Sequence, residues 1–281
     1  MRRVTTSVAT DRPARLVVGL LLAVELVIAV VLVVRTPDAP ASPPAAVPPA
    51  SGPPAATSTT LVLRDGRSAD LLTLGGESSA DLAGRISAEL DAAEAAVTAF
   101  WGEEWPRHVD LVLTGTDEEF RIVGGGGSDI AATAMDTRIV FAPGAAAMSA
   151  DSLRIVLRHE LFHYAARAET AADAPRWLTE GVADFVGRPP APVPGATRAA
   201  ELAQLPTDAD LDTPGRTRSL AYDRAWWFSR FVADRYGTET LRRLYLTACG
   251  PGHADVATAI RAVLGADTGQ VLAAWRAWLA G

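Results

Sequence analysis

The sequence is poor in three residue types that carry much of protein chemistry. It contains no lysine, a single cysteine and only four histidines among 281 residues. Cys249 alone excludes an intramolecular disulfide and any zinc cluster built from cysteines. With 49% hydrophobic and 21% charged residues, the chain is too apolar to be disordered, and its length allows one large domain or two small ones.

Positive charge is also scarce. The net charge is −7, and residues 1–35 carry five arginines against two acids, so the rest of the chain has a net charge of −10. An acidic body repels the phosphate backbone of DNA and RNA, which excludes nucleic-acid binding as the main function.

One long apolar run lies near the N-terminus. Residues 16–34 contain fifteen Leu, Ile or Val residues and one charge, Glu25, and at ~1.5 Å per residue they span roughly 28 Å, close to the hydrocarbon core of a membrane. The apolar residues favour insertion by roughly 4.5 to 9 kcal/mol, against a cost of about 3 kcal/mol for one acid. The run predicts a retained transmembrane anchor. The alternative is a signal peptide, for which Ala39-Pro40-Ala41 is a poor cleavage site.

The segments on either side of this run suggest a topology. Arginines cluster before it, so the positive-inside rule predicts that residues 1–15 are cytoplasmic and that the remainder of this single-pass membrane protein is extracytoplasmic. Residues 35–60 are rich in proline and alanine, a composition that favours an extended chain. We interpret them as a stalk, with a tract for a proline-recognising partner as the alternative.

Residues 61–281 are expected to form one α+β domain, in which a small N-terminal sheet with a packed helix precedes a mostly helical half. The expected sheet contains a hairpin around Asp65-Gly66 and strands over Val109–Leu113, Ile130–Ala134 and Arg138–Ala142. Apolar periodicity predicts helices over Ser79–Trp101, Asp117–Val123, Ala150–Arg167, Pro175–Val186, Ser219–Tyr236, Thr238–Thr247, Asp255–Leu264 and Thr268–Leu279.

The motif His159-Glu160-Leu161-Phe162-His163 lies inside one of these helices. Residues four apart share a helix face, so both imidazoles can reach one zinc ion, while Glu160 is displaced and suits a general base. The alternative is a solvent-exposed trio without a metal. Two of the four histidines lie here, among apolar neighbours, and a buried ionisable trio without partners would be costly.

A third ligand is predicted on the following helix, which begins near Pro175 and which Asp173 can cap. Glu180 faces the first helix if the two pack antiparallel, which completes three protein ligands and leaves a fourth position open. Asp184, one turn later, can accept a hydrogen bond from the far nitrogen of a ligand histidine. The alternative for both residues is a carboxylate on a helix surface.

The His-Glu-x-x-His helix followed by Trp177-Leu178-Thr179-Glu180-Gly181-Val182-Ala183 resembles the gluzincin metallopeptidases. The resemblance is nearest to the bacterial proteins described as peptidase MA-like, in the clan of thermolysin and the zinc aminopeptidases. It implies a zincin-like catalytic domain with one Zn²⁺ on His159, His163 and Glu180, Glu160 as the base and Asp184 supporting a histidine. The 16 residues between His163 and Glu180 differ from the 18 of the aminopeptidases, so aminopeptidase specificity is not implied.

An oxyanion donor is also expected, and the family uses a tyrosine or histidine on a later helix. Tyr222 is the candidate, with an aromatic core position as the alternative, and His253 is the second candidate. His108, at the start of a strand, is interpreted as structural. Ile130–Ala134 is a candidate edge strand for an extended substrate.

Two further features have mainly structural interpretations. Asp136 is interpreted as a turn residue rather than as a ligand for a substrate amine. Gly124–Gly127 is either a lip over the cleft or an ordinary loop.

The sequence therefore predicts a membrane-anchored, extracytoplasmic zinc metallopeptidase that acts on a peptide or protein. Two alternatives remain: a catalytically silent zincin-fold binding module, and a zinc hydrolase acting on a non-peptide amide or ester. The sequence does not set the oligomeric state or the cleavage preference.

Overall fold

A computed structural model of the chain describes residues 56–75, 77–125 and 130–281. The expected anchor over 16–34 and nearly all of the expected stalk lie outside these residues. Among the described residues, no helix is both long enough and apolar enough to cross a membrane.

The fold is α+β, as expected, with all strands before residue 142 and mostly helices after it. The five strands form one sheet in the order β1-β2-β3-β5-β4, with β1 antiparallel to β2, β2 and β3 parallel, β3 and β5 parallel, and β4 antiparallel to β5. The strands are β1 (Thr57–Val62), β2 (Ser68–Thr73), β3 (His108–Leu113), β4 (Ala132–Ala134) and β5 (Arg138–Phe141).

Two helices lie between strands in the chain, and the others follow the last strand. They are α2 (Glu77–Trp101), α3 (Asp117–Val123), α4 (Ala150–Ala166), α5 (Arg176–Gly187), α6 (Ala196–Leu202), α7 (Asp208–Asp212), α8 (Arg216–Tyr236), α9 (Thr238–Cys249), α10 (Val256–Leu264) and α11 (Thr268–Ala280), with 3-10 helices η1 (Pro143–Ala147) and η2 (Arg167–Glu169). The short helices α6 and α7 were not predicted.

The sheet begins four residues before the domain start expected at residue 61, because β1 begins at Thr57 and Thr57–Thr60 pair with β2. Five of the six β1 residues are exposed, so the strand lacks the apolar alternation that identifies a half-buried strand in a sequence. β1 is identified as a strand by its hydrogen-bonded ladder with β2 and not by its own sequence pattern.

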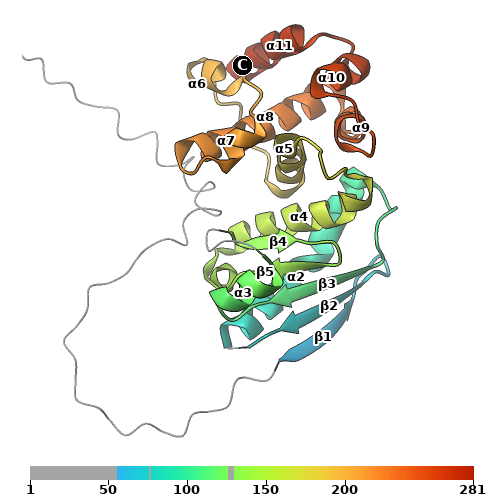
Figure 1. The fold of residues 1–281 in the computed structure, drawn as a ribbon, viewed down its shortest axis with the longest axis vertical. Helices are drawn as coiled ribbons and strands as arrows, with labels where there is room; N and C mark the ends of the chain where they lie inside the picture. The colour runs from blue at the N-terminus through green and yellow to red at the C-terminus, as the bar shows by residue number, and fades with distance from the viewer. Residues whose placement is uncertain (1–55, 76, 126–129) are drawn as a thin grey trace, which may run out of the picture.

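Alternating side chains of the sheet enter two apolar clusters. Val109, Leu111 and Leu113 of β3 belong to the main core with α2 and α4, whereas Val112 packs with Phe120 of α3 on the opposite face. In Figure 1, α4 lies between the sheet and α5, and α5 lies beside α8. The helical half therefore contacts the sheet through α4.

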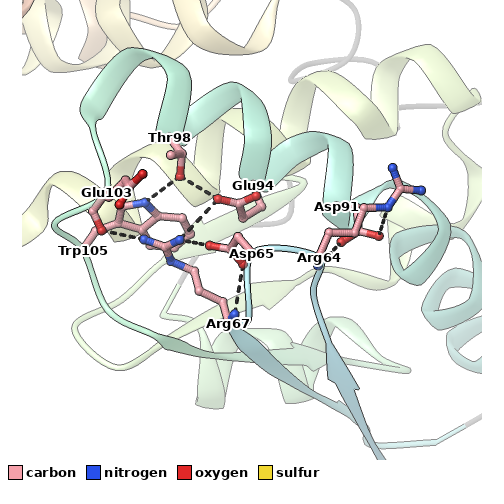
Figure 2. A network of polar contacts seen from close by, with 8 residues as sticks. All are labelled: Arg64, Asp65, Arg67, Asp91, Glu94, Thr98, Glu103 and Trp105. Carbon is pink, nitrogen blue, oxygen red and sulfur yellow. Dashed lines mark hydrogen bonds and ion pairs between the residues drawn. The ribbon is translucent and has the colours of Figure 1, made fainter.

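A buried arginine fastens the β1–β2 hairpin to α2. The Arg67 side chain is 2% exposed, pairs with Asp65 and with Glu94 of α2 (3.3 Å), and stacks 3.9 Å from the centre of the Trp105 ring (Figure 2). Because a buried guanidinium is stable only with such partners, this network fixes the hairpin against the helix.

Candidate active site

A cleft of about 550 Å³ opens between the sheet edge and the helical half. Residues 130–134 and Asp136 form one wall, residues of α4 and α5 form the opposite walls, and Tyr222 of α8 contributes a side chain. β4 is the edge strand on this side and is paired only with β5 among the described strands. The edge strand expected over Ile130–Ala134 is present beside the cleft but is shorter, because the strand covers only Ala132–Ala134.

Helix α4 presents the two histidines one turn apart. Its first turn is capped by the Ser149 hydroxyl, which accepts from the backbone N–H of Ser152. His159 is 8% exposed, and its Nε2 lies 3.1 Å from Nε2 of His163. The Nε2 atoms of the two histidines therefore face one point in the cleft.

Helix α5 brings Glu180 to the same point. One carboxylate oxygen lies 3.2 Å from His159 Nε2 and the other lies 3.5 Å from His163 Nε2. The helix begins differently from expectation, because Asp173 does not cap it. The side chain of Asp208, at the start of α7, instead accepts the backbone N–H groups of Arg176 and Trp177.

Two glycines allow α5 to approach its neighbours closely. A Cβ on Gly181 would lie 2.5 Å from the Ala225 carbonyl oxygen of α8, and one on Gly187 would lie 2.9 Å from the Ile155 carbonyl oxygen of α4. Glu180 therefore sits where three helices meet at backbone contact distance.

The donor atoms suit a zinc ion. Ligand atoms bound at ~2.05 Å in a tetrahedron are ~3.3 Å apart. The two Nε2 atoms here are 3.1 Å apart, and each lies close to a different oxygen of Glu180, at 3.2 Å for His159 and 3.5 Å for His163. Two imidazoles and a carboxylate form a usual zinc set, and His159, His163 and Glu180 offer their donor atoms within 4.8 Å of one another.

Asp184 supports this set from behind. Its Oδ1 lies 3.0 Å from Nδ1 of His159, so the imidazole donates there and turns Nε2 toward the cleft. The other oxygen, Oδ2, forms an ion pair at 2.7 Å with Arg188, a residue that the sequence analysis did not identify. The expected place of Asp184 beside a candidate ligand histidine agrees with this geometry.

The charges of the site raise the pKa of His159 and lower the pKa of Glu180. Burial alone lowers the pKa of His159, but hydrogen bonds to Asp184 and Glu180 outweigh it and raise that pKa well above 6.5. Burial likewise raises the pKa of Glu180, yet the charges and hydrogen bonds of His163 and His159 lower it overall. A proton shared by His159 and Glu180 in the metal-free site is therefore held on the His159 imidazole and not on the Glu180 carboxylate.

Glu160 lines the cleft together with Ala134 of β4, whose backbone slightly favours the charged carboxylate. Burial raises the pKa of its carboxyl group above the ordinary value, with the histidines opposing that shift. A carboxylate of raised pKa beside a metal-binding set is suited to accept a proton.

Of the two candidate oxyanion donors, only Tyr222 lines the cleft. Its hydroxyl interacts with Glu180, whose charge raises the tyrosine pKa together with burial, so the hydroxyl keeps its proton and can donate. His253 instead lies 3.4 Å from Asp173, near the end of α9. The structure brings Tyr222 to the site and leaves His253 outside it.

The remaining expected features are placed as follows. His108 starts β3 on an exposed part of the sheet, near Asp70 and Asp110, and does not line the cleft. Asp136 follows β4 and lines the cleft. Part of the Gly124–Gly127 segment lies outside the described residues.

Comparison with known proteins gives a distant likeness to solved structures. No protein-family model and no curated protein matches the sequence. Aminopeptidase A of Legionella pneumophila, in complex with aspartic acid, is 15% identical with a TM-score of 0.49, over 79% of this chain and 28% of that one. The E323A mutant of an M1 zinc metallopeptidase from Deinococcus radiodurans is 16% identical with a TM-score of 0.48, over 82% of this chain and 53% of that one.

The chain thus spans between about a quarter and a half of the length of these solved chains. Likeness at this level does not place the chain in a family. The geometry of the cleft carries the functional assignment below.

Proposed function

We propose that the protein is a zinc-dependent hydrolase of peptide bonds. The observation that carries the proposal is that His159, His163 and Glu180 each offer a donor atom within 4.8 Å of the others, beside the partly buried carboxyl group of Glu160. A zinc ion held there supplies a Lewis acid for a water and a carbonyl group.

The side chains around the metal-binding set have separate roles. Glu160 accepts the proton of the attacking water and returns it to the leaving amine. Tyr222 donates its hydroxyl hydrogen to the oxygen that gains negative charge. The histidines and Glu180 hold the ion, and Asp184 fixes the ring of His159.

The free edge of β4 favours a peptide over a small-molecule amide or ester. Residues 131–134 line the cleft, and their backbone groups on that side have no partner strand among the described residues. An extended peptide can pair with such an edge, which orients its amide bonds along the cleft. A non-peptide substrate would leave this edge unused.

The intact base argues against a silent binding module. A module that only binds has no use for a partly buried carboxyl group of raised pKa in the cleft, because removing such a group from water is unfavourable. Glu160 is therefore assigned to chemistry.

Metal analysis and peptide turnover on the same sample test the proposal. The wild-type domain should bind about one zinc ion, and His163→Ala or Glu180→Ala should lose most of it. Glu160→Gln keeps the size of the side chain but cannot accept a proton, so zinc content should stay near wild type while turnover falls by at least ~10²-fold. Zinc retained at full occupancy in both ligand variants, or wild-type turnover by Glu160→Gln, contradicts the assignment.

We further propose that residues 16–34 anchor the protein in a membrane with its catalytic domain outside the cytoplasm. The length and apolar content of the run and the arginines before it support this topology. Protease added outside intact cells should cleave the domain from the membrane. A full-length protein left intact, while known surface proteins are degraded, contradicts the orientation.

A further inference from the structure

The two oxygens of Asp184 contact different residues. Oδ1 contacts His159, a candidate zinc ligand, and Oδ2 contacts Arg188, which is not one. Oδ1 lies 3.0 Å from His159 Nδ1, and Oδ2 lies 2.7 Å from Nη2 of Arg188. The Asp184 side chain is 2% exposed and that of Arg188 is 7% exposed. Because water does not reach this pair freely, the orientation of the carboxylate depends on these two partners.

Arg188 is itself held from a second helix. Its Nη1 lies 3.5 Å from Asp223 of α8, and its guanidinium lies 5.2 Å from the Trp226 ring centre. Arg188 caps the C-terminal end of α5, and its backbone N–H donates to the Asp184 carbonyl at 2.8 Å. The contacts run from α8 through Arg188 and Asp184 to His159.

We propose that Arg188 is a positioning residue for the candidate zinc site and acts through Asp184. This inference rests on the proposed function. With Oδ2 held by the guanidinium, the carboxylate keeps Oδ1 toward His159 Nδ1, and the ring keeps Nε2 toward His163 and Glu180. Without Arg188, Oδ2 has no charged partner and the carboxylate can rotate, so the ring loses its fixed orientation. The other reading of Arg188 is a plain structural link between α5 and α8.

Zinc affinity separates these two readings, because a structural link changes stability without a matching change in affinity. The zinc dissociation constant is measured by competition with a chromophoric chelator, and thermal unfolding of the zinc-free protein is recorded alongside. Removal of a group that orients a ligand typically costs 10–100-fold in metal affinity. Arg188→Met should weaken zinc binding by about 10-fold or more, and Arg188→Lys should recover part of that loss.

Arg198 offers a matched control. It approaches Asp223 at 3.8 Å from another side, is 32% exposed and does not line the cleft. Arg198→Met removes an arginine from the same acid without touching Asp184, so zinc affinity should stay within about 3-fold of wild type, the level expected of a pair in contact with water.

A double-mutant cycle tests whether the effect runs through Asp184. In an Asp184→Ala background, Arg188→Met should change zinc affinity little further, because the group it orients is gone. Unchanged affinity in Arg188→Met, or a loss fully additive with Asp184→Ala, overturns the inference. If Arg188→Met does not fold, Arg188→Lys decides, since a lysine cannot contact both acids as the guanidinium fork does: wild-type affinity in that variant also overturns it. Absence of zinc from the wild-type protein would instead refute the proposed function.

Discussion

At the scale of single residues, the balance between two carboxylates and one imidazole dominates the site. His159 contacts Glu180 through Nε2 and Asp184 through Nδ1. In the metal-free protein both contacts favour an imidazolium, and a bound cation replaces the proton on the Nε2 side. The site therefore binds either a proton or a metal at Nε2 of His159. Rising pH should destabilise the zinc-free protein and strengthen zinc binding.

The first prediction concerns the pH dependence of stability. The folded pKa of His159 is raised above 6.5, so its contribution to the stability of the zinc-free protein is full below 6.5 and is lost as pH rises through the folded pKa. Glu180 has a lowered pKa, so its contribution is lost only in acid. The melting temperature of the zinc-free protein should therefore fall as pH rises above 6.5.

Zinc should reverse this trend, because metal binding releases the histidine protons and strengthens as pH rises. His159→Gln is the control, since it removes the titrating group and should flatten the zinc-free profile above pH 6.5. A zinc-free slope that is the same in wild type and His159→Gln would assign the effect to another group.

A second prediction concerns Tyr222. Its hydroxyl interacts with Glu180 and lines the cleft, and loss of one oxyanion donor typically lowers turnover by about 10²–10³-fold. Tyr222→Phe should lower kcat by that amount and leave zinc content unchanged. His253→Ala, outside the cleft, should leave kcat near wild type. Zinc loss in Tyr222→Phe would show that the hydroxyl serves the metal-binding set instead.

At the scale of elements, the position of α5 decides the site, because this helix contacts both α4 and α8. Its backbone lies against Ala225 of α8 at Gly181 and against Ile155 of α4 at Gly187. Small residues at these crossings let Glu180 reach the histidines and Tyr222 reach Glu180. With larger residues at positions 181 and 187, α5 would lie further from α8 and α4.

This gives a third prediction. Gly181→Ala puts a Cβ 2.5 Å from a backbone oxygen of α8, so α5 and α8 must separate, at a cost of about 1–3 kcal/mol in unfolding free energy. Turnover should fall as well, because Tyr222 moves with α8. Gly84 in α2 is the control: nothing lies within 4 Å of its Cβ position, so Gly84→Ala should stabilise by about 0.5–1 kcal/mol. Chemical denaturation measures both, and equal effects would contradict the packing argument.

The sequence predicted those parts of the site that depend on local spacing. His159 and His163 share a face because a helix repeats every 3.6 residues, and Glu180 and Asp184 follow the same rule on α5. Arg188 was missed although it follows Asp184 by four residues, a spacing at which an acid and an arginine can pair on one helix. Asp208 and the tight approach at Gly181 were missed as well, since they depend on a partner more than 30 residues away and on a crossing of two helices. The sequence carries no local signal for such contacts.

The same distinction applies to the strands and short helices. Strands with apolar alternation were predicted close to their observed bounds, whereas the polar β1 was recognised only from Leu61 onward. Helices α6 and α7 have seven and five residues, too short for a clear apolar period.

At the scale of the whole molecule, the sheet has two edges with different surroundings. β4 borders the cleft, and β1 lies at the opposite end of the strand order, next to the N-terminal segment. Three strands, β2, β3 and β5, lie between β1 and the strand that borders the cleft, and Figure 1 shows β1 and β4 on opposite sides of the sheet. Changes at the β1 edge should alter stability without altering the site.

The last prediction uses this separation. A fragment that starts at Leu61 lacks four of the six β1 residues and loses their ladder with β2, including the 2.6 Å hydrogen bond from the Thr60 hydroxyl to Asp70. With a net contribution of about 0.5–1.5 kcal/mol per hydrogen bond, it should be less stable than a fragment that starts at Ala56 by at least about 1 kcal/mol. Its zinc dissociation constant and peptide turnover should match those of the longer fragment, because β1 does not line the cleft. Equal unfolding free energies would show that β1 adds nothing to the fold, and a loss of zinc binding in the shorter fragment would show that the two sheet edges are coupled.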